Sequence, residues 1–306
     1  MEVLFDIVAG VDVHKDFLSI SVITGGRNGE EIMETWECST FTDDLATAGK
    51  KILSLGAKHV AMESTGVYWR PVYNVWNSMG IIITLANASH VKNVPGRKTD
   101  PHDSRWIAKL HRCGLIRGSY IPEVEFQELR ALTRHRRSLI TDLAKVKNRT
   151  QKILEDGNIK LGSVLSDVFG VAGYAIVTAL ANGEIDPDKL ADLVVTNVKA
   201  PRSEIRKSLI HTLKGYQVLL LQELLRQYMS LQNLIDSINK EIDEKMTKHQ
   251  PLIEKLDAVP GIDVKIAQDI IAEATTKMEN FKDAKTFAAW AGVAPGNNES
   301  GGKKKV

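Results

Sequence analysis

The sequence lacks the features of secreted, disulfide-rich and membrane proteins. Its two cysteines, Cys38 and Cys113, are too few in 306 residues for a disulfide framework, and they are typical of a reducing compartment. No run reaches the ~18 consecutive apolar residues of a membrane-spanning helix. The N-terminal residues MEVLFDIVAGVDVHKD carry acids where a signal peptide has a basic region. We therefore expect neither secretion nor a membrane span.

The composition is 43% hydrophobic and 25% charged, which is ordinary for a globular protein and excludes a disordered or collagen-like chain. At ~150 residues per domain, the length predicts about two domains. The net charge of +2 averages a patterned distribution, because basic residues concentrate in one part of the chain. The patterns below predict an α/β domain over 1–118, a basic helical and coiled-coil linker over 119–250, and a helical domain over 251–306, of which the family resemblance given below implies only the start.

The first segment alternates between strand and helix patterns. Apolar or alternating runs predict strands at 5–12, 17–24, 31–38, 58–63 and 80–86. Helical patterns cover 43–55, 68–79 and 100–113. Pattern alone supports only the α/β class, but three strands, a helix, and then strand, helix, strand and helix form the element order of a ribonuclease-H-like domain. We expect that fold.

Four carboxylates stand where strands end or a helix begins. Asp12 ends the first strand, Glu63 ends a later one, and Asp100 and Asp103 lie three apart at a predicted helix start. Like charges that converge cannot all stay ionised unless cations lie between them. Oxygen ligands favour Mg²⁺ or Mn²⁺, and two such ions can stabilise both oxygens of a phosphodiester displacement. The pattern therefore favours a metal-dependent site acting on phosphodiesters.

Each of these residues also has an ordinary structural explanation. An Asp at a strand end is often a turn residue, and an Asp-x-x-Asp pair at a helix start commonly caps the helix. His14 and His102 could support the carboxylates or lie solvated in loops. A zinc site is disfavoured because no spaced cluster of cysteine and histidine exists. The order of the acids along the chain favours the interpretation in which all four carboxylates form one metal site.

Basic residues dominate a helical pattern between 123 and 156, with Asp142 the one acid between Arg130 and Lys152. Further basic residues surround Asp100 and Asp103. The residues that we expect to contact a nucleic-acid backbone are Lys92, Arg97, Lys98, Arg105, Arg130, Arg134, Arg137, Lys145, Lys147 and Arg149. The sequence does not choose between DNA and RNA, and a solvated charged face is the alternative.

The second half of the chain is helical. Residues 161–212 predict short helices broken at Gly170, Gly173, Gly183 and Pro201. A heptad seam follows, formed by Leu221, Leu224, Tyr228, Leu231, Ile235, Ile238 and Ile242. The seam fits a coiled-coil hairpin, a dimer contact, or a bundle helix packed within one chain.

The segment 256–274 (LDAVPGIDVKIAQDIIAEA) resembles a helix-hairpin-helix, whose turn offers backbone N–H groups to a phosphate. Gly261 lies in that turn, and we include it among the nucleic-acid contacts. Such hairpins usually carry a second glycine where this sequence has Asp263, whose carboxylate would repel a phosphate. A plain helical hairpin is the alternative.

Taken together, these blocks resemble one family. GVDVHKDFLSISV, MESTGVYW and GRKTDPHDSRWIAKL are similar to the three acidic blocks of the IS110 insertion-sequence transposases, which are DEDD recombinases with a RuvC-like N-terminal domain. LDAVPGIDVKIAQDIIAE and FKDAKTFAAWAGVAPGNNESGGK resemble that family's C-terminal transposase domain. The resemblance covers both ends of the chain, and the helical region between them is less diagnostic.

The resemblance implies that Asp12, Glu63, Asp100 and Asp103 bind Mg²⁺ or Mn²⁺, and that Ser300 attacks a DNA phosphodiester. It further implies a cytoplasmic, prokaryotic, nucleoid-associated enzyme that acts on donor and target DNA. A structured non-coding guide RNA is implied as a partner, as is a homo-oligomer (dimer or tetramer) formed through the coiled coil. Family chains continue well past this serine, so we expect a truncated chain. From its own surroundings, NNESG, Ser300 is a loop residue with no base beside it.

Other functions fit parts of the sequence. A junction-resolving or ribonuclease-H-like nuclease would use water as nucleophile and leave Ser300 structural. A truncated, non-catalytic remnant would bind nucleic acid with a steep salt dependence and cut nothing. An actin-like ATPase is disfavoured, because GVDVHKDF lacks a glycine-rich phosphate loop.

Overall fold

The computed structural model describes residues 3–25, 31–63, 66–86, 103–195, 198–294, 299–300 and 303–304. The chain divides into two compact units, Met1–Ile121 (unit 1) and Pro122–Val306 (unit 2). The strands of unit 1 are β1 (Val8–Val13), β2 (Phe17–Thr24), β3 (Ile32–Ser39), β4 (His59–Glu63) and β5 (Ile82–Ala86). Its helices are α1 (Thr42–Ser54), α2 (Trp69–Ser78) and α4 (Asp103–Arg112).

The five strands form one mixed sheet in the order β3-β2-β1-β4-β5. β1, β2 and β3 pair antiparallel as two hairpins, whereas β4 and β5 run parallel to β1. This mixed sheet, with a helix after β3 and after β4, has the predicted element order of a ribonuclease-H-like domain. The α/β prediction for this part of the chain is therefore confirmed.

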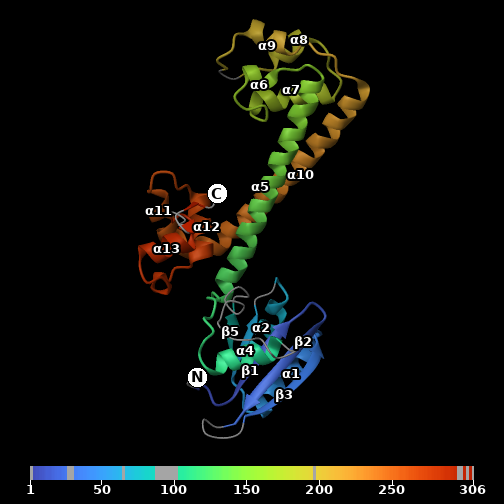
Figure 1. Ribbon diagram of the computed structural model, residues 1–306. Helices are drawn as coiled ribbons and strands as arrows, with labels where there is room; N and C mark the ends of the chain where they lie inside the picture. Colours follow the sequence, from blue (N-terminus) through green and yellow to red (C-terminus); the bar gives the residue numbers. More distant parts are fainter. Residues whose placement is uncertain are drawn as a thin grey trace. The chain divides into compact units, whose positions relative to one another are not determined.

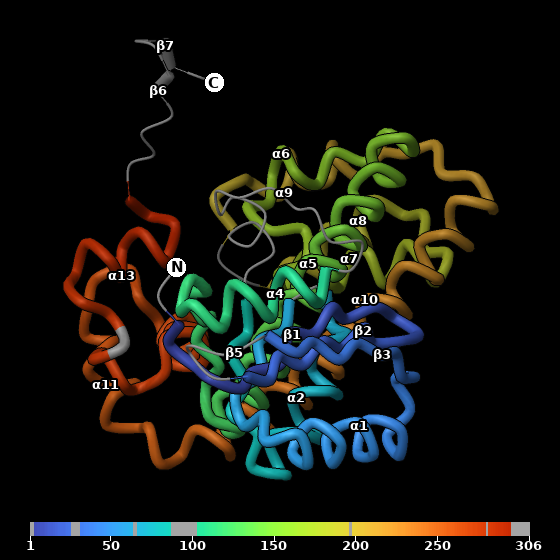
Figure 2. The backbone as a smooth tube through the Cα atoms, turned by 60° about the horizontal axis from the view of Figure 1, so that its bottom comes forward, coloured from blue at the N-terminus to red at the C-terminus, as the bar shows by residue number. Residues whose placement is uncertain are grey.

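Helices cover both faces of the sheet, with α1 and α2 on one side and α4 on the other (Figure 2). The α1–α2 face holds the larger core, in which Trp76 is fully buried and its indole N–H donates to the Leu45 carbonyl at 2.7 Å. On the other face, α4 contacts β1, β2 and β4. A helix on each face explains why β1 and β2 are buried on both sides.

Unit 2 is helical (Figure 1). Its helices are α5 (Val124–Asp156), α6 (Leu161–Val164), α7 (Val171–Ala181), α8 (Pro187–Asp192), α9 (Arg202–Ser208), α10 (Gly215–Met246), α11 (Gln250–Asp257), α12 (Val264–Ala274) and α13 (Ala284–Trp290). Single 3-10 turns, η1 (Thr247–His249) and η2 (Met278–Asn280), and two short strands, β6 (Glu299–Ser300) and β7 (Lys303–Lys304), complete it.

The long helices α5 and α10 lie side by side in opposite directions (Figure 1). Near one end, Leu129 of α5 and Ile242 of α10 belong to one buried apolar cluster, and near the other Leu154 and Leu221 belong to a second. All seven residues of the predicted heptad seam are buried or half-buried. The seam therefore packs within the chain, as a helical hairpin would.

The short helices of 161–212 follow the predicted breaks at Gly170, Gly183 and Pro201, but the break at Gly173 is wrong. Gly173 lies inside α7. A Cβ there would lie 2.3 Å from the carbonyl oxygen of Val168. Glycine is needed at this position because only a residue without Cβ lets the first turn of α7 lie against the backbone of the loop that precedes it.

Candidate active site

Asp12 and Glu63 occupy matching positions on neighbouring parallel strands. Gly10 of β1 pairs with Ala61 of β4, and Val11 with Met62, so the next residues along the two strands are Asp12 and Glu63. Adjacent strands are ~4.8 Å apart, and residues two apart share a face. Gly10 and Ala61 both face α4. The two carboxylates therefore project from the α4-covered face at the carboxyl ends of their strands.

Asp103 begins α4 at the same end of the sheet. The Arg112 carbonyl, at the last residue of α4, accepts hydrogen bonds from the N–H groups of Leu4 and Phe5, just before β1. In the first turn of α4, Ser104 contacts Ser19, the cross-strand partner of Asp12. α4 therefore runs opposite to β1. Its first residue, Asp103, lies toward the strand ends that carry Asp12 and Glu63.

Asp12 pairs with His14, whose Nε2 lies 3.1 Å from the Asp12 carboxylate. The His14 ring stacks on Phe17 with centroids 4.4 Å apart, which holds the imidazole beside the carboxylate. No three His, Cys, Asp or Glu side chains within the described residues lie close enough together to hold a metal ion. The predicted fourth carboxylate, Asp100, and His102 lie outside the described residues.

Ser300 lies in unit 2, in the two-residue strand β6. β6 pairs antiparallel with β7, and Ser300 is opposite Lys303. The predicted nucleophile and the predicted metal ligands thus come from different units of the chain.

The structure distinguishes the predicted nucleic-acid contacts by their protein partners. Arg134 binds Glu273 through two hydrogen bonds of 2.6 and 2.8 Å, and Arg130 donates to the Ala272 carbonyl at 3.0 Å. These two arginines hold the C-terminal end of α12. Arg105 donates to the Thr35 hydroxyl at 3.2 Å.

The remaining predicted contacts differ in exposure. Lys145 pairs with Asp142 at 2.9 Å, and the Lys147 ammonium lies over the rings of Phe169 and Tyr228. Arg137 and Arg149 are exposed, with no acid of the described residues within ion-pair distance. Lys92, Arg97 and Lys98 lie outside the described residues.

The turn between α11 and α12 contains Gly261 in a left-handed conformation, with φ of 89°. Asp263 is the N-cap of α12, and its carboxylate accepts a hydrogen bond of 2.8 Å from the Ile266 N–H. A carboxylate thus already occupies the helix N-terminus that a phosphate would use.

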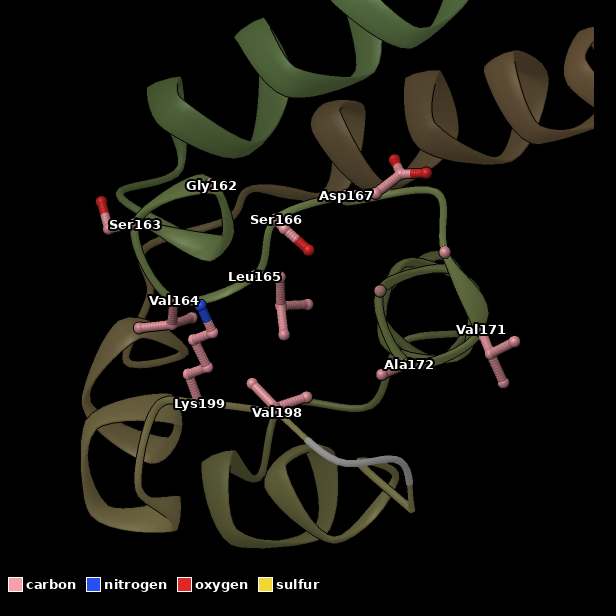
Figure 3. Close-up of a pocket in the computed structure, with 12 residues that line it drawn as sticks. Gly162, Ser163, Val164, Leu165, Ser166, Asp167, Val171, Ala172, Val198 and Lys199 are labelled. Atoms are coloured by element: carbon pink, nitrogen blue, oxygen red, sulfur yellow. The ribbon is translucent and has the colours of Figure 1, made fainter. Parts of the chain in front are cut away.

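A cavity of about 550 Å³ lies in the helical part of unit 2, and Figure 3 shows the residues around it. Leu165, Ala172 and Val198 line it, together with the polar residues Ser166 and Lys199. Asp167 stands at its margin, where its carboxylate accepts from the Phe169 N–H at 2.8 Å. That carboxylate is used to hold the loop before α7, and none of the predicted site residues lines the cavity.

The sequence patterns did not identify the buried polar residues that join the first turn of α4 to the sheet. Ser19, Ser21 and Ser104 are buried, and the Ser104 hydroxyl is hydrogen-bonded to those of Ser19 and Ser21. Gly10 lets the α4 backbone touch β1. The one sequence feature that could have indicated the buried serines of β2 is the alternation of serine with apolar residues in FLSISVIT. The same alternation also fits a half-exposed strand.

Two family comparisons cover most of the chain. Residues 9–159 match the IS110 DEDD family, described as Transposase. Residues 253–306 match the family described as Transposase IS116/IS110/IS902. No helix in the described part of the chain has the length and hydropathy needed to cross a membrane.

Individual relatives agree with these matches. The transposase for insertion sequence element IS1533 of Leptospira borgpetersenii is 30% identical over 51% of this chain and 45% of its own length. A probable family 20 transposase of Pseudomonas aeruginosa is 24% identical over 81% of this chain and 64% of its own. The chain thus spans less than two thirds of either relative. The RuvC structure of Thermus thermophilus aligns over 37% of this chain and 99% of its own, with 14% identity and a TM-score of 0.29.

Proposed function

Because the chain belongs to the IS116/IS110/IS902 family of transposases, we propose that it cuts and rejoins DNA during the movement of an insertion sequence. Asp12, Glu63, Asp100 and Asp103 bind a divalent cation, and Ser300 attacks the DNA phosphodiester. The observation that carries this proposal is the strand register, which sets Asp12 beside Glu63 on the face that α4 covers.

The donor set fits Mg²⁺ or Mn²⁺, since it consists of carboxylate oxygens at strand ends and a helix start. A bound cation would offset the repulsion among the acids and the charge that develops on the phosphate oxygens. Asp12 and Glu63 contribute ligands from a rigid sheet, and His14 orients the Asp12 carboxylate from 3.1 Å away. Asp103 adds a ligand from the first turn of α4.

Ser300 supplies the covalent step. Its hydroxyl oxygen forms a bond to phosphorus, its proton passes to a base, and the bond from phosphorus to one deoxyribose oxygen breaks, with that oxygen taking up a proton. The phosphoserine linkage conserves the free energy of the phosphodiester bond that was cut. A deoxyribose hydroxyl can therefore attack the phosphoserine and rejoin a strand. A serine hydroxyl is a weak nucleophile until activated. The acids of unit 1 and Ser300 of unit 2 must therefore act on the same phosphodiester, from one subunit or two.

The proposal extends to partners. Donor and target DNA are the substrates, and a structured non-coding RNA is the guide. Arg137 and Arg149, exposed on α5, suit backbone contacts with either nucleic acid. Because the heptad seam packs against α5 of the same chain, a homo-oligomer formed through these helices would use other faces of the pair.

Trapping on nicked suicide DNA tests the proposal. We expect a protein-linked strand with the unmodified chain and with the control Ser237→Ala, exposed on α10, but none with Ser300→Ala, which should still bind DNA. Asp12→Asn and Asp103→Asn should keep the fold and lose Mg²⁺-dependent cleavage. An adduct that persists in Ser300→Ala would refute the serine assignment. Hydrolysed ends without any linked strand would indicate a nuclease that uses water.

A further inference from the structure

A continuous network of hydroxyl groups joins the first turn of α4 to the sheet. The Ser104 hydroxyl lies 3.0 Å from that of Ser19 and 2.8 Å from that of Ser21. Ser21 is hydrogen-bonded at 3.0 Å to Thr35 of β3, which accepts from Arg105 Nε at 3.2 Å. The two residues that follow Asp103 are thus both tied to the sheet.

The network is unusual for its location. Ser21 and Ser104 have no exposed surface, and Ser19 is 5% exposed. A buried hydroxyl lowers stability unless it is hydrogen-bonded, and alanine would fill nearly the same space. Packing therefore does not require the hydroxyls. What they add is direction, because a hydrogen bond depends on the angle between donor and acceptor, whereas the hydrophobic effect is non-directional.

Gly10 brings the helix within reach of this network. A Cβ at Gly10 would lie 2.2 Å from the Ala108 nitrogen and 2.4 Å from the Ser104 carbonyl oxygen. The backbone of α4 thus rests directly on β1. Since Ser19 is the cross-strand partner of Asp12, the network links the neighbour of one predicted ligand to the neighbour of another.

We propose that Ser19, Ser21 and Ser104 are positioning residues, which hold Asp103 at the end of the sheet that carries Asp12 and Glu63 and thereby set the affinity of the proposed metal site for a divalent cation. This inference rests on the metal site of the proposed function. The serines themselves bind no cation. Loss of a partner hydrogen-bonded to a metal ligand lowers metal affinity by about 10–100-fold. Because these serines hold the residue next to the ligand, we expect an effect at the lower end of that range.

Manganese binding tests the inference without a cleavage assay. The full chain is titrated with Mn²⁺, and free Mn²⁺ is followed by electron paramagnetic resonance. We expect Ser104→Ala to raise the Kd by about tenfold, and Ser104→Cys, which is somewhat larger but keeps a weak donor, to raise it less. The control Ser208→Ala removes a buried serine of unit 2 that bonds the Ile205 carbonyl, and it should leave the Kd unchanged.

Measuring both the Kd for Mn²⁺ and the number of Mn²⁺ sites per chain distinguishes a misplaced ligand from an unfolded chain. A variant that unfolds loses Mn²⁺ sites per chain, whereas a misplaced Asp103 raises the Kd of sites that remain. Should Ser104→Ala fail to fold, Ser19→Ala and Ser21→Ala each leave Ser104 one partner and should give smaller increases in Kd.

Two results would overturn the inference in different ways. If serine variants bind Mn²⁺ as the unmodified chain does while Asp103→Asn loses it, the positioning role is wrong and the metal site stands. If Asp12→Asn and Asp103→Asn also bind unchanged, or the unmodified chain binds none, the proposed function fails and this inference with it.

Discussion

Arg134 of α5 and Glu273 of α12 form a two-pronged ion pair, with Arg134 Nε and Nη2 each donating to a different carboxylate oxygen of Glu273. The hydrogen bond raises the pKa of Arg134 above its ordinary value. One turn earlier, Arg130 donates to the carbonyls of Ala272 and Glu273. Cations at the C-terminal end of α12 also complement its dipole. These arginines therefore already have protein partners that a phosphate would have to displace.

This pairing predicts different roles for two arginines of α5. Arg149→Gln should lower the slope of log affinity against log salt by about 1, as expected for one lost phosphate contact. Arg134→Gln should change that slope little, because Glu273 holds its guanidinium. Fluorescence anisotropy with a labelled oligonucleotide over a range of KCl concentrations measures both. Equal slopes for the two variants would contradict this assignment.

Arg136 and Arg137 are sequence neighbours with opposite environments. Arg136 is 2% exposed and donates to Gln268 at 2.7 Å and to Asp269 at 2.6 Å. We expect Arg136→Met to destabilise unit 2 by about 3 kcal/mol, since it takes a donor from the buried Gln268 amide and the ion-pair partner from the half-exposed Asp269. Arg137→Met, the matched control on the exposed face, should stay within about 0.5 kcal/mol. Chemical denaturation followed by circular dichroism measures both free energies of unfolding. Equal effects of the two substitutions would show that the contacts of Arg136 with α12 do not stabilise unit 2.

The order of elements in unit 1 could be predicted because each strand and helix shows its own local periodicity. The strand expected over 58–63 is β4, His59–Glu63, and the helix expected over 43–55 is α1, Thr42–Ser54. Glu63 could be placed at a strand end for the same reason. Its match with Asp12 depends on the pairing of β1 with β4, which no local pattern encodes.

The supporting contacts could not be predicted because their partners are distant in sequence. Ser19 and Ser21 alternate with apolar residues as in a strand with one wet face, yet α4 buries that face. Arg136 lies 132 positions from its partner Gln268, and nothing local distinguishes it from Arg137. Tertiary contacts thus decide which polar residues of these periodic segments are buried.

Gly10 is a position where one methyl group has a large effect. A Cβ would meet backbone atoms of α4, which cannot rotate away as a side chain can. We expect Gly10→Ala to destabilise unit 1 by about 3 kcal/mol, the upper range for overpacking. Gly215→Ala is the control, because no atom lies within 4 Å of a Cβ at Gly215. Thermal melts compare them, and a Gly10→Ala chain as stable as the control would refute the close contact.

His111 of α4 makes the stability of unit 1 depend on pH. The residue is 4% exposed, its ring lies 5.2 Å from that of Phe5, and no described group bonds its buried Nε2. Burial, together with repulsion from His59, lowers the pKa of His111 from 6.5 to about 4. Between those values the unfolded chain binds a proton that the folded chain does not. The free energy of unfolding therefore falls as the pH drops from 6.5, by up to about 1.4 kcal/mol per pH unit, and levels off near 4.

Urea unfolding at several pH values tests this expectation in the difference between two chains, since other groups titrate in the same range. His111→Phe keeps an aromatic ring beside Phe5 and removes the titrating group, so we expect its stability to decline less steeply below pH 6.5 than that of the unmodified chain. His135→Gln, at an exposed position on α5, should leave the decline unchanged. Parallel curves for His111→Phe and the unmodified chain would mean that His111 takes up a proton in the folded state. The burial that lowers its pKa would then have to be relieved by an opening of α4 from the sheet.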